Sequence, residues 1–209
     1  RRKLEELRER NIAYINNYTP ANSSKDLHDA YDHLNKEDLE SKKITNLSLA
    51  GRIVLKRVMG NASFITIRDG SGDIQAYITK NNIDPDLYKN FKTWDLGDIV
   101  GVGGNLFKTK TEELTIEAHS IILITKALRP MPEKHKGLAD IEIKYRQRYL
   151  DLMSSPESKE VFEKRSRIVS SVRSTMLEDG FLEVETPMMH SIPGGAVARP
   201  FVTQHNALD

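Results

Sequence analysis

Five short stretches rich in aliphatic and β-branched residues occupy residues 47–125, and they constrain the fold more than any other feature. Turn signals separate most of them, with Met-Gly-Asn at 59–61 and Asp-Gly-Ser-Gly at 69–72. Between the third and fourth stretches lies DPDLYKNFKTW, which predicts a short helix with Pro85 near its first turn. The five stretches are LSLAGRIVLKRV, ASFITIR, DIQAYIT, DIVGVGGNLF and ELTIEAHSIILIT. We therefore expect five strands with one helix after the third.

This order of elements is that of an OB-fold barrel, although several other small barrels share it. Alternation along the second stretch places Ile65 and Ile67 on one face and Phe64 on the other, and Gln75 and Tyr77 share one face of the third. The aliphatic faces should fill the barrel. The aromatic side chains then lie outside, on the surface that OB-folds use for oligonucleotides, where bases can stack. The alternative, that Phe64 packs under the N-terminal helices, stays open.

Basic residues occur at two places that nucleic acid could use. Arg52, Lys56 and Arg57 of the first stretch can supply contacts to phosphates or bases. Residues 126–150 contain seven Lys and Arg against three Asp and Glu, with a helical pattern from Ile141 onward. A helix exposing residues 144–148 could lie against phosphates or simply be solvated, and the pattern does not decide between the two.

The remaining segments predict a chain of four parts. Residues 1–46 predict amphipathic helices, the first capped by Ser23, and residues 47–125 the barrel. Residues 126–155 read as a linker and hinge. Residues 156–209 open with a long helix over 156–179, which Ser155 can cap and Gly180 can end, followed by a strand at FLEVET that stops at Pro187.

Composition excludes several classes of protein. The chain of 209 residues has 31 Lys and Arg against 30 Asp and Glu, so a globally basic nucleic-acid protein is not indicated. No cysteine is present, which excludes disulfide scaffolds, thiolate zinc sites and cysteine nucleophiles and is compatible with a cytoplasmic location. No apolar run approaches the length of a membrane span, and the N-terminal residues lack a secretory signal. Spacing alone reveals no catalytic constellation and no metal site.

The segment GFLEVETPMM resembles motif 1 of class II aminoacyl-tRNA synthetases, with Gly180, Phe181, Val184 and Pro187 at matching positions. An OB-fold ahead of motif 1 is similar to the subclass for lysine, aspartate and asparagine. LFKTKTEELTI, TKALRPMP, YRQRYLDLM and IPGGAVARPF together resemble lysyl-tRNA synthetases of the bacterial type. The implied fold class is α+β: an OB-fold with flanking helices, followed by the start of an antiparallel-sheet catalytic domain.

The resemblance also implies roles for individual residues. Phe64 would stack on an anticodon uridine of tRNA(Lys), and Arg57, Gln75 and Glu113 would contact anticodon bases. Gly194 and Gly195 would line the pocket for the substrate lysine. Phe181 and Pro187 would belong to a homodimer interface. These last roles, and that of Glu113, follow from the resemblance and not from the face alternation.

The implied activity is the ATP- and Mg²⁺-dependent attachment of lysine to tRNA(Lys). The ATP- and metal-binding residues of the class lie in motifs 2 and 3, beyond motif 1, so we expect no catalytic residue and no activity in these 209 residues alone. An alternative is a separate OB-fold RNA-binding protein that dimerises through helix 156–179. A synthetase-like lysyltransferase acting on a protein is a third, disfavoured because such relatives usually lack the barrel.

Overall fold

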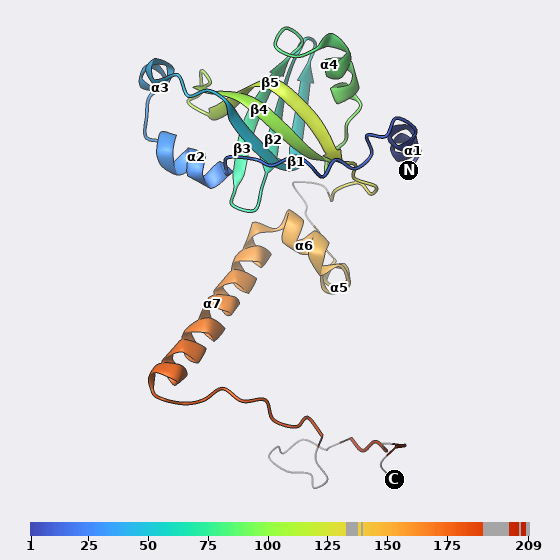
Figure 1. Ribbon diagram of the computed structural model, residues 1–209, viewed down its shortest axis with the longest axis vertical. Coiled ribbons are helices and arrows are strands. Elements are labelled where there is room, and N and C mark those ends of the chain that lie inside the picture. Colours follow the sequence, from blue (N-terminus) through green and yellow to red (C-terminus); the bar gives the residue numbers. More distant parts are fainter. Residues whose placement is uncertain (133–137, 139, 190–200, 205, 208–209) are drawn as a thin grey trace. The chain divides into compact units, whose positions relative to one another are not determined.

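The computed structural model describes residues 1–132, 138, 140–189, 201–204 and 206–207. These residues form two compact units, Arg1–Lys136 and Gly137–Asp209, which are described separately below. Figure 1 shows the strands gathered in the first unit, whereas the second unit is drawn as helices followed by extended chain.

The first unit is built on a closed five-stranded barrel, which confirms the expected OB-fold. The strands run in the order β1-β2-β3-β5-β4, and β1 also pairs with β4. Every neighbouring pair is antiparallel except β3 with β5, which is parallel. The bounds are β1 Leu47–Met59, β2 Ala62–Arg68, β3 Asp73–Thr79, β4 Ile99–Lys108 and β5 Leu114–Thr125.

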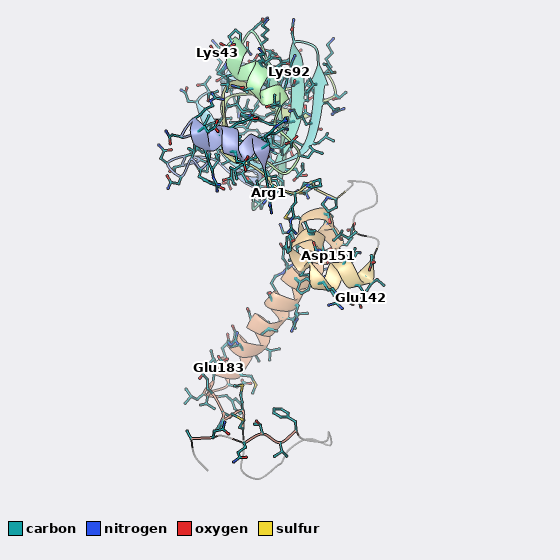
Figure 2. The ribbon with its side chains drawn as sticks, turned by 90° about the vertical axis from the view of Figure 1, so that its right-hand side faces the viewer. Arg1, Lys43, Lys92, Glu142, Asp151 and Glu183 are labelled. Carbon is teal, nitrogen blue, oxygen red and sulfur yellow. The ribbon has the colours of Figure 1, made fainter. Side chains whose placement is uncertain are left out.

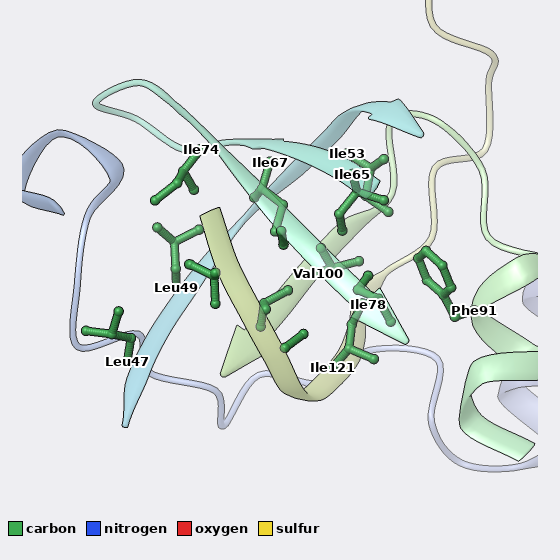
Figure 3. Close-up of a cluster of buried hydrophobic side chains, with 14 of the residues drawn as sticks. Leu47, Leu49, Ile53, Ile65, Ile67, Ile74, Ile78, Phe91, Val100 and Ile121 are labelled. Carbon is green, nitrogen blue, oxygen red and sulfur yellow. The ribbon is translucent and has the colours of Figure 1, made fainter. Parts of the chain in front are cut away.

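The barrel interior is filled by aliphatic side chains from all five strands (Figure 3). Ile65 and Ile67 are fully buried, and Ile74, Ala76 and Ile78 of β3 are buried with them. Strict alternation of buried and half-buried residues along β2 and β3 confirms the predicted faces. One side of each strand therefore supplies the core, and the other side is available for contacts outside the barrel.

The GVGG segment shapes β4, because all three of its glycines lie against other groups at close range. A Cβ atom on Gly101 would lie 2.5 Å from the ring of Tyr18, and one on Gly104 would lie 1.9 Å from the carbonyl oxygen of Glu117. Only glycine allows the backbone to approach this closely.

Four helices surround the barrel: α1 Arg2–Glu9, α2 Ser24–Tyr31, α3 Lys36–Lys42 and α4 Pro85–Lys92. Three of these helices carry a side-chain cap at the N-terminus, and the cap predicted at Ser23 is confirmed. The Ser23 hydroxyl accepts the Asp26 amide, the Asn35 side chain accepts the Asp38 amide, and the Asp84 carboxylate caps α4.

Asp69 joins α2 to the turn between β2 and β3. Its carboxylate accepts the amide of Ser24 at 2.6 Å and the hydroxyls of Ser24 and Ser71 at 2.7 Å. Partial burial raises the pKa of Asp69, but these hydrogen bonds outweigh burial and lower it to about 2. The ionised carboxylate thus holds this side of the barrel in place at neutral pH.

The second unit contains α5 Ile141–Arg146, α6 Arg148–Ser154 and α7 Pro156–Glu178, so the long helix is confirmed. The buried carboxylate of Asp151 ion-pairs with Arg148 and accepts the Ser158 hydroxyl at 3.0 Å, which fixes α6 against the start of α7 (Figure 2). Gly180 has a φ of 84°, a conformation that favours glycine after a helix.

The strand expected at FLEVET is not formed in the described part of the chain. Residues 181–187 are extended but have no ladder partner, and a strand exists only where a neighbour completes its backbone hydrogen bonds. Among the helices described, none has the length and apolar character needed to cross a membrane.

Candidate nucleic-acid interface

An open groove of about 540 Å³ lies on the outer face of the barrel. β1, β2 and β3 contribute six of its ten lining residues, and the end of β4 with the following turn contributes the other four. The lining residues are Arg57, Met59, Ala62, Phe64, Gln75, Tyr77, Phe107, Thr109, Lys110 and Thr111. Three of the four predicted barrel site residues are therefore brought together in one place.

Arg57, Phe64 and Tyr77 form a continuous row across three strands. Arg57 is the register partner of Phe64, which in turn is the partner of Tyr77. The Phe64 and Tyr77 rings are 4.8 Å apart between centroids, and Phe107 meets Tyr77 edge-on at 6.1 Å. Both rings of the row are half-buried, so each keeps part of its face open to the groove. This row offers aromatic surface for stacking with an arginine at one end.

Gln75 lies beside this row, on the strand that carries Tyr77. The Thr115 hydroxyl lies 3.1 Å from the Gln75 side-chain oxygen and 3.1 Å from the Glu113 carbonyl oxygen. Because a hydroxyl has one proton, it can donate to only one of these acceptors at a time. The amide nitrogen of Gln75 has no hydrogen-bond partner among the described residues, so its donors remain free to face the groove.

Glu113 is adjacent to the groove but does not line it. It ends the exposed turn between β4 and β5, where its amide donates to the Thr109 hydroxyl at 3.2 Å. Glu112 in the same turn has a φ of 59°. Three residues that precede Glu113 in this turn, Thr109, Lys110 and Thr111, do line the groove. The Glu113 carbonyl and the Gln75 side-chain oxygen thus compete for the same Thr115 hydroxyl, while the Glu113 carboxylate is exposed on the turn.

Arg52 and Lys56 do not join the site, and here the sequence-based interpretation is wrong. Arg52 donates to the Gly97 carbonyl at 2.8 Å. The Lys56 ammonium donates to the Phe91, Lys92 and Trp94 carbonyls at the end of α4, at 2.7–3.1 Å. Burial lowers the pKa of Lys56 to about 8. Both cations are committed to the barrel's own backbone, which strand alternation could not reveal.

Phe64 lies in the groove with Tyr77 and Phe107, which favours the exposed position over packing under the N-terminal helices. Sequence reasoning missed Phe107 and Thr115. Alternation would have found the first, because Leu106 is buried and its neighbour must face outward. Thr115 is itself buried, and only the register between β3 and β5 brings it to Gln75.

The second unit carries a separate apolar groove of about 430 Å³ along the C-terminal half of α7. The segment after Gly180 folds back here, since the Phe181 amide donates to the Met176 carbonyl and Arg173 pairs with Glu183 at 2.9 Å. Phe181 lines this groove, whereas Pro187 lies beyond it in the extended segment. Gly194 and Gly195 fall outside the described residues.

The basic helix pattern of the second unit is partly neutralised within the unit. Arg146 pairs with Glu142 at 3.1 Å, and Arg148 pairs with the buried Asp151. Arg148 also lies over the rings of Tyr145 and Phe162 at 5.2 and 5.0 Å. Of the three cations within residues 144–148, which are Lys144, Arg146 and Arg148, the two arginines therefore have partners within the unit. Their exposed edges can still contact a phosphate.

Within the described ranges, no group of three or more His, Asp or Glu side chains is arranged to hold a metal ion. The described residues therefore offer no such ligand set for Mg²⁺.

Comparison with known families agrees with both units. Residues 47–124 match the family described as "OB-fold nucleic acid binding domain", and residues 140–209 match "tRNA synthetases class II (D, K and N)". The first match coincides with the closed barrel and its groove. Residues 140–209 are therefore similar to class II tRNA synthetases of the aspartate, lysine and asparagine group, and residues 47–124 are similar to OB-fold nucleic-acid-binding domains.

Individual relatives that are similar to this chain over its whole length are lysine–tRNA ligases. The lysine–tRNA ligase of Chromobacterium violaceum is 56% identical over 209 residues, which cover 100% of this chain and 41% of that protein. The lysine–tRNA ligases of Methylobacillus flagellatus and Azoarcus sp. are 53% and 54% identical over the same length, covering 41% and 42% of those proteins. The chain thus spans about two fifths of the length of these relatives.

Proposed function

We propose that this chain is the anticodon-reading and motif 1 part of a lysine–tRNA ligase. The observation that carries the proposal is the row Arg57–Phe64–Tyr77, with Gln75 beside it, on the open face of an OB-fold barrel. The identity to lysine–tRNA ligases over the whole chain supports the choice of substrate. The RNA partner is then the anticodon loop of tRNA(Lys).

The groove would bind RNA in two ways, by stacking aromatic rings on bases and by hydrogen bonds to base edges. Phe64 stacks on a base, with Tyr77 supporting its ring from the neighbouring strand. The free amide donors of Gln75 bond to a base edge, while Thr115 fixes the Gln75 oxygen. Arg57 supplies charge and hydrogen bonds at one end of the row, and the exposed Glu113 carboxylate accepts from a base that reaches the turn. Uridine bases suit this set because each presents both donor and acceptor groups.

The whole protein would attach lysine to tRNA(Lys) through a lysyl-adenylate formed from ATP with Mg²⁺, a reaction of the cytoplasm. Gly194 and Gly195 would line the lysine pocket. The contribution of these residues is to bind and orient the RNA, because the ATP- and metal-binding residues of the class belong to motifs 2 and 3, which follow motif 1. We therefore expect the 209-residue chain alone to bind RNA without catalysing lysine-dependent exchange of pyrophosphate with ATP.

The apolar groove on α7 supports a proposed homodimer. Val172, Met176 and Phe181 line it and are all exposed. Burying one such side chain is worth roughly 1.5–3 kcal/mol. A partner subunit that covers this groove would remove several of them from water together, with Phe181 and the segment through Pro187 at the contact.

Gln75 provides the sharpest test of base reading. Isothermal titration would compare stem–loop RNAs that carry UUU or UCU in the loop, with the unchanged chain and with Gln75→Ala. The unchanged chain should prefer UUU. Gln75→Ala should lose more of that preference than of its overall affinity, because a bidentate base contact is worth roughly 1–3 kcal/mol of discrimination. Equal preference in the variant and the unchanged chain would contradict the proposed role.

Thr66→Ala is the matched control. Thr66 is the register partner of Gln75 and is half-buried on the same face of the barrel, but it does not line the groove. It should leave both affinity and preference unchanged, so a loss specific to Gln75→Ala would report on the groove rather than on the stability of the strand pair.

A further inference from the structure

A second pocket of the barrel unit, of about 610 Å³, lies where the chain leaves β5. The start of α1, the turn before β4 and residues 126–131 form its wall. Five of its lining side chains are cations and one is an acid: Arg1, Arg2, Lys3, Lys126 and Arg129 against Asp95. This pocket shares no residue with the open groove on the outer face of the barrel, nor with the apolar groove along α7.

The negative charge of Asp95, the acidic residue of this wall, is neutralised by two lysines of the same wall. The Asp95 carboxylate accepts from Lys3 at 2.7 Å and from Lys126 at 2.6 Å, and Lys126 also binds the fully buried Asp98 at 2.6 Å. Partial burial raises the pKa of Asp95, but the hydrogen bonds from these two lysines outweigh it and lower the pKa. Two lysines and two aspartates therefore balance each other, and Asp95 is not paired with any arginine of the pocket.

The arginines of the pocket are open to solvent. Arg129 is exposed and has no ion-pair or hydrogen-bond partner among the described residues. The Arg2 side chain is 88% exposed and lies 3.6 Å from Glu6, a surface pair of the kind that contributes little. An exposed guanidinium presents a planar fork of donors that suits a phosphate.

The pocket and the groove lie at opposite ends of the β4–β5 pair. Phe107 pairs with Thr115 at the groove end, and Ile99 pairs with Thr125 at the pocket end (Figure 1). Thr125 lies ten residue steps after Thr115 along β5, a distance of roughly 30 Å at the usual rise of a strand. A few bases bound in the groove therefore leave the pocket free for another part of the same RNA.

We propose that this pocket binds backbone phosphates of the RNA stem whose loop occupies the groove. The inference rests on the proposed function for its choice of RNA. Arg129 and Arg2 make the contacts, and the Lys3–Asp95–Lys126–Asp98 network holds residues 126–131 against α1 so that both arginines face one volume. Such contacts fix the position and orientation of an RNA without reading its sequence.

The test is the salt dependence of binding. The chain, Arg129→Gln, Phe64→Ala and the control Lys89→Gln would each be titrated over a series of KCl concentrations. One ligand is the UUU stem–loop, and the other is a single-stranded RNA of five nucleotides with UUU at its centre. Lys89 is an exposed cation of α4 that lines neither pocket, so it controls for the loss of one charge.

Arg129→Gln should lower the affinity for the stem–loop and reduce the slope of log K against log[salt] by about one. It should leave binding of the short single strand unchanged, whereas Phe64→Ala should weaken both ligands. If Arg129→Gln matches Lys89→Gln on the stem–loop, the proposal is wrong. If only Phe64→Ala is silent, the groove assignment fails and the phosphate pocket stands.

Free phosphate is the other source of the same chemistry. Inorganic phosphate would be titrated into the chain and into Arg129→Gln, followed by phosphorus NMR. Binding that depends on Arg129, together with unchanged stem–loop affinity in the variant, would assign the pocket to a small anion and overturn the RNA assignment.

Discussion

The barrel and α7 use the same aliphatic residues in opposite ways. Ile65 in β2 is 0% exposed, whereas Ile168 in α7 is 64% exposed. The barrel closes on itself, so its five strands satisfy their backbone hydrogen bonds and bury their apolar faces without outside help. α7 also has an apolar side, but none of its own residues is buried by the described residues of its unit. One unit buries its apolar faces by itself, and the other leaves apolar side chains exposed, which we propose are covered by a partner subunit.

The largest effect expected from this difference is a change of oligomeric state. The 209-residue chain should dimerise or associate further through α7 at tens of micromolar in sedimentation velocity. Val172→Glu should shift it toward monomer, because a charge would have to be buried in the apolar groove. Val58→Glu, at an exposed residue of β1, is the matched control and should not. A monodisperse monomer for the unchanged chain would contradict the proposed dimer.

A smaller effect, on stability, separates the two regions residue by residue. Ile65→Ala should cost about 2–5 kcal/mol of unfolding free energy, because it leaves a cavity in a closed core. Ile168→Ala should stay within about 0.5 kcal/mol, because the side chain is already in water. Urea unfolding would follow the barrel by the fluorescence of Trp94, the chain's single tryptophan, and α7 by helical circular dichroism. An equal loss of unfolding free energy in Ile65→Ala and Ile168→Ala would contradict the proposed difference between the two regions.

The smallest effect is a pH dependence confined to the barrel. The pKa of Asp69 is lowered to about 2, so the folded state binds fewer protons than the unfolded state between about pH 4 and pH 2. Barrel stability should therefore fall as the pH drops through that window, by on the order of 1 kcal/mol after allowing for solvent screening. Asp69→Asn should remove this part of the pH dependence. If the unfolding free energy of Asp69→Asn falls with acid by the same amount as that of the unchanged chain, the role assigned to Asp69 is wrong.

Sequence patterns predicted the barrel well because its constraints are local. Alternation in ASFITIR and DIQAYIT fixed the core faces, and the observed β2 and β3 have those bounds. The cap at Ser23 follows from residue type and spacing. The same alternation placed Phe64, Gln75 and Tyr77 on one outer face before any strand register was known.

Features that depend on distant contacts were not predictable in this way. Lys56 has the charge of a phosphate ligand, yet its position relative to the end of α4 makes it a partner of three carbonyls. Thr115 reaches Gln75 only through the parallel pairing of β3 with β5. FLEVET has the composition of a strand, but strand formation also requires a neighbour, and the described residues supply none.

The most direct test of the central claim, that the barrel groove reads RNA bases, is the affinity of Phe64→Ala for the UUU stem–loop by isothermal titration. Stacking on Phe64 predicts a loss of roughly 1–3 kcal/mol. Phe162→Ala is the matched control, since it removes a partly exposed ring from the other unit, and it should bind as the unchanged chain does. Unchanged affinity in Phe64→Ala, with the barrel still folded, would contradict the account.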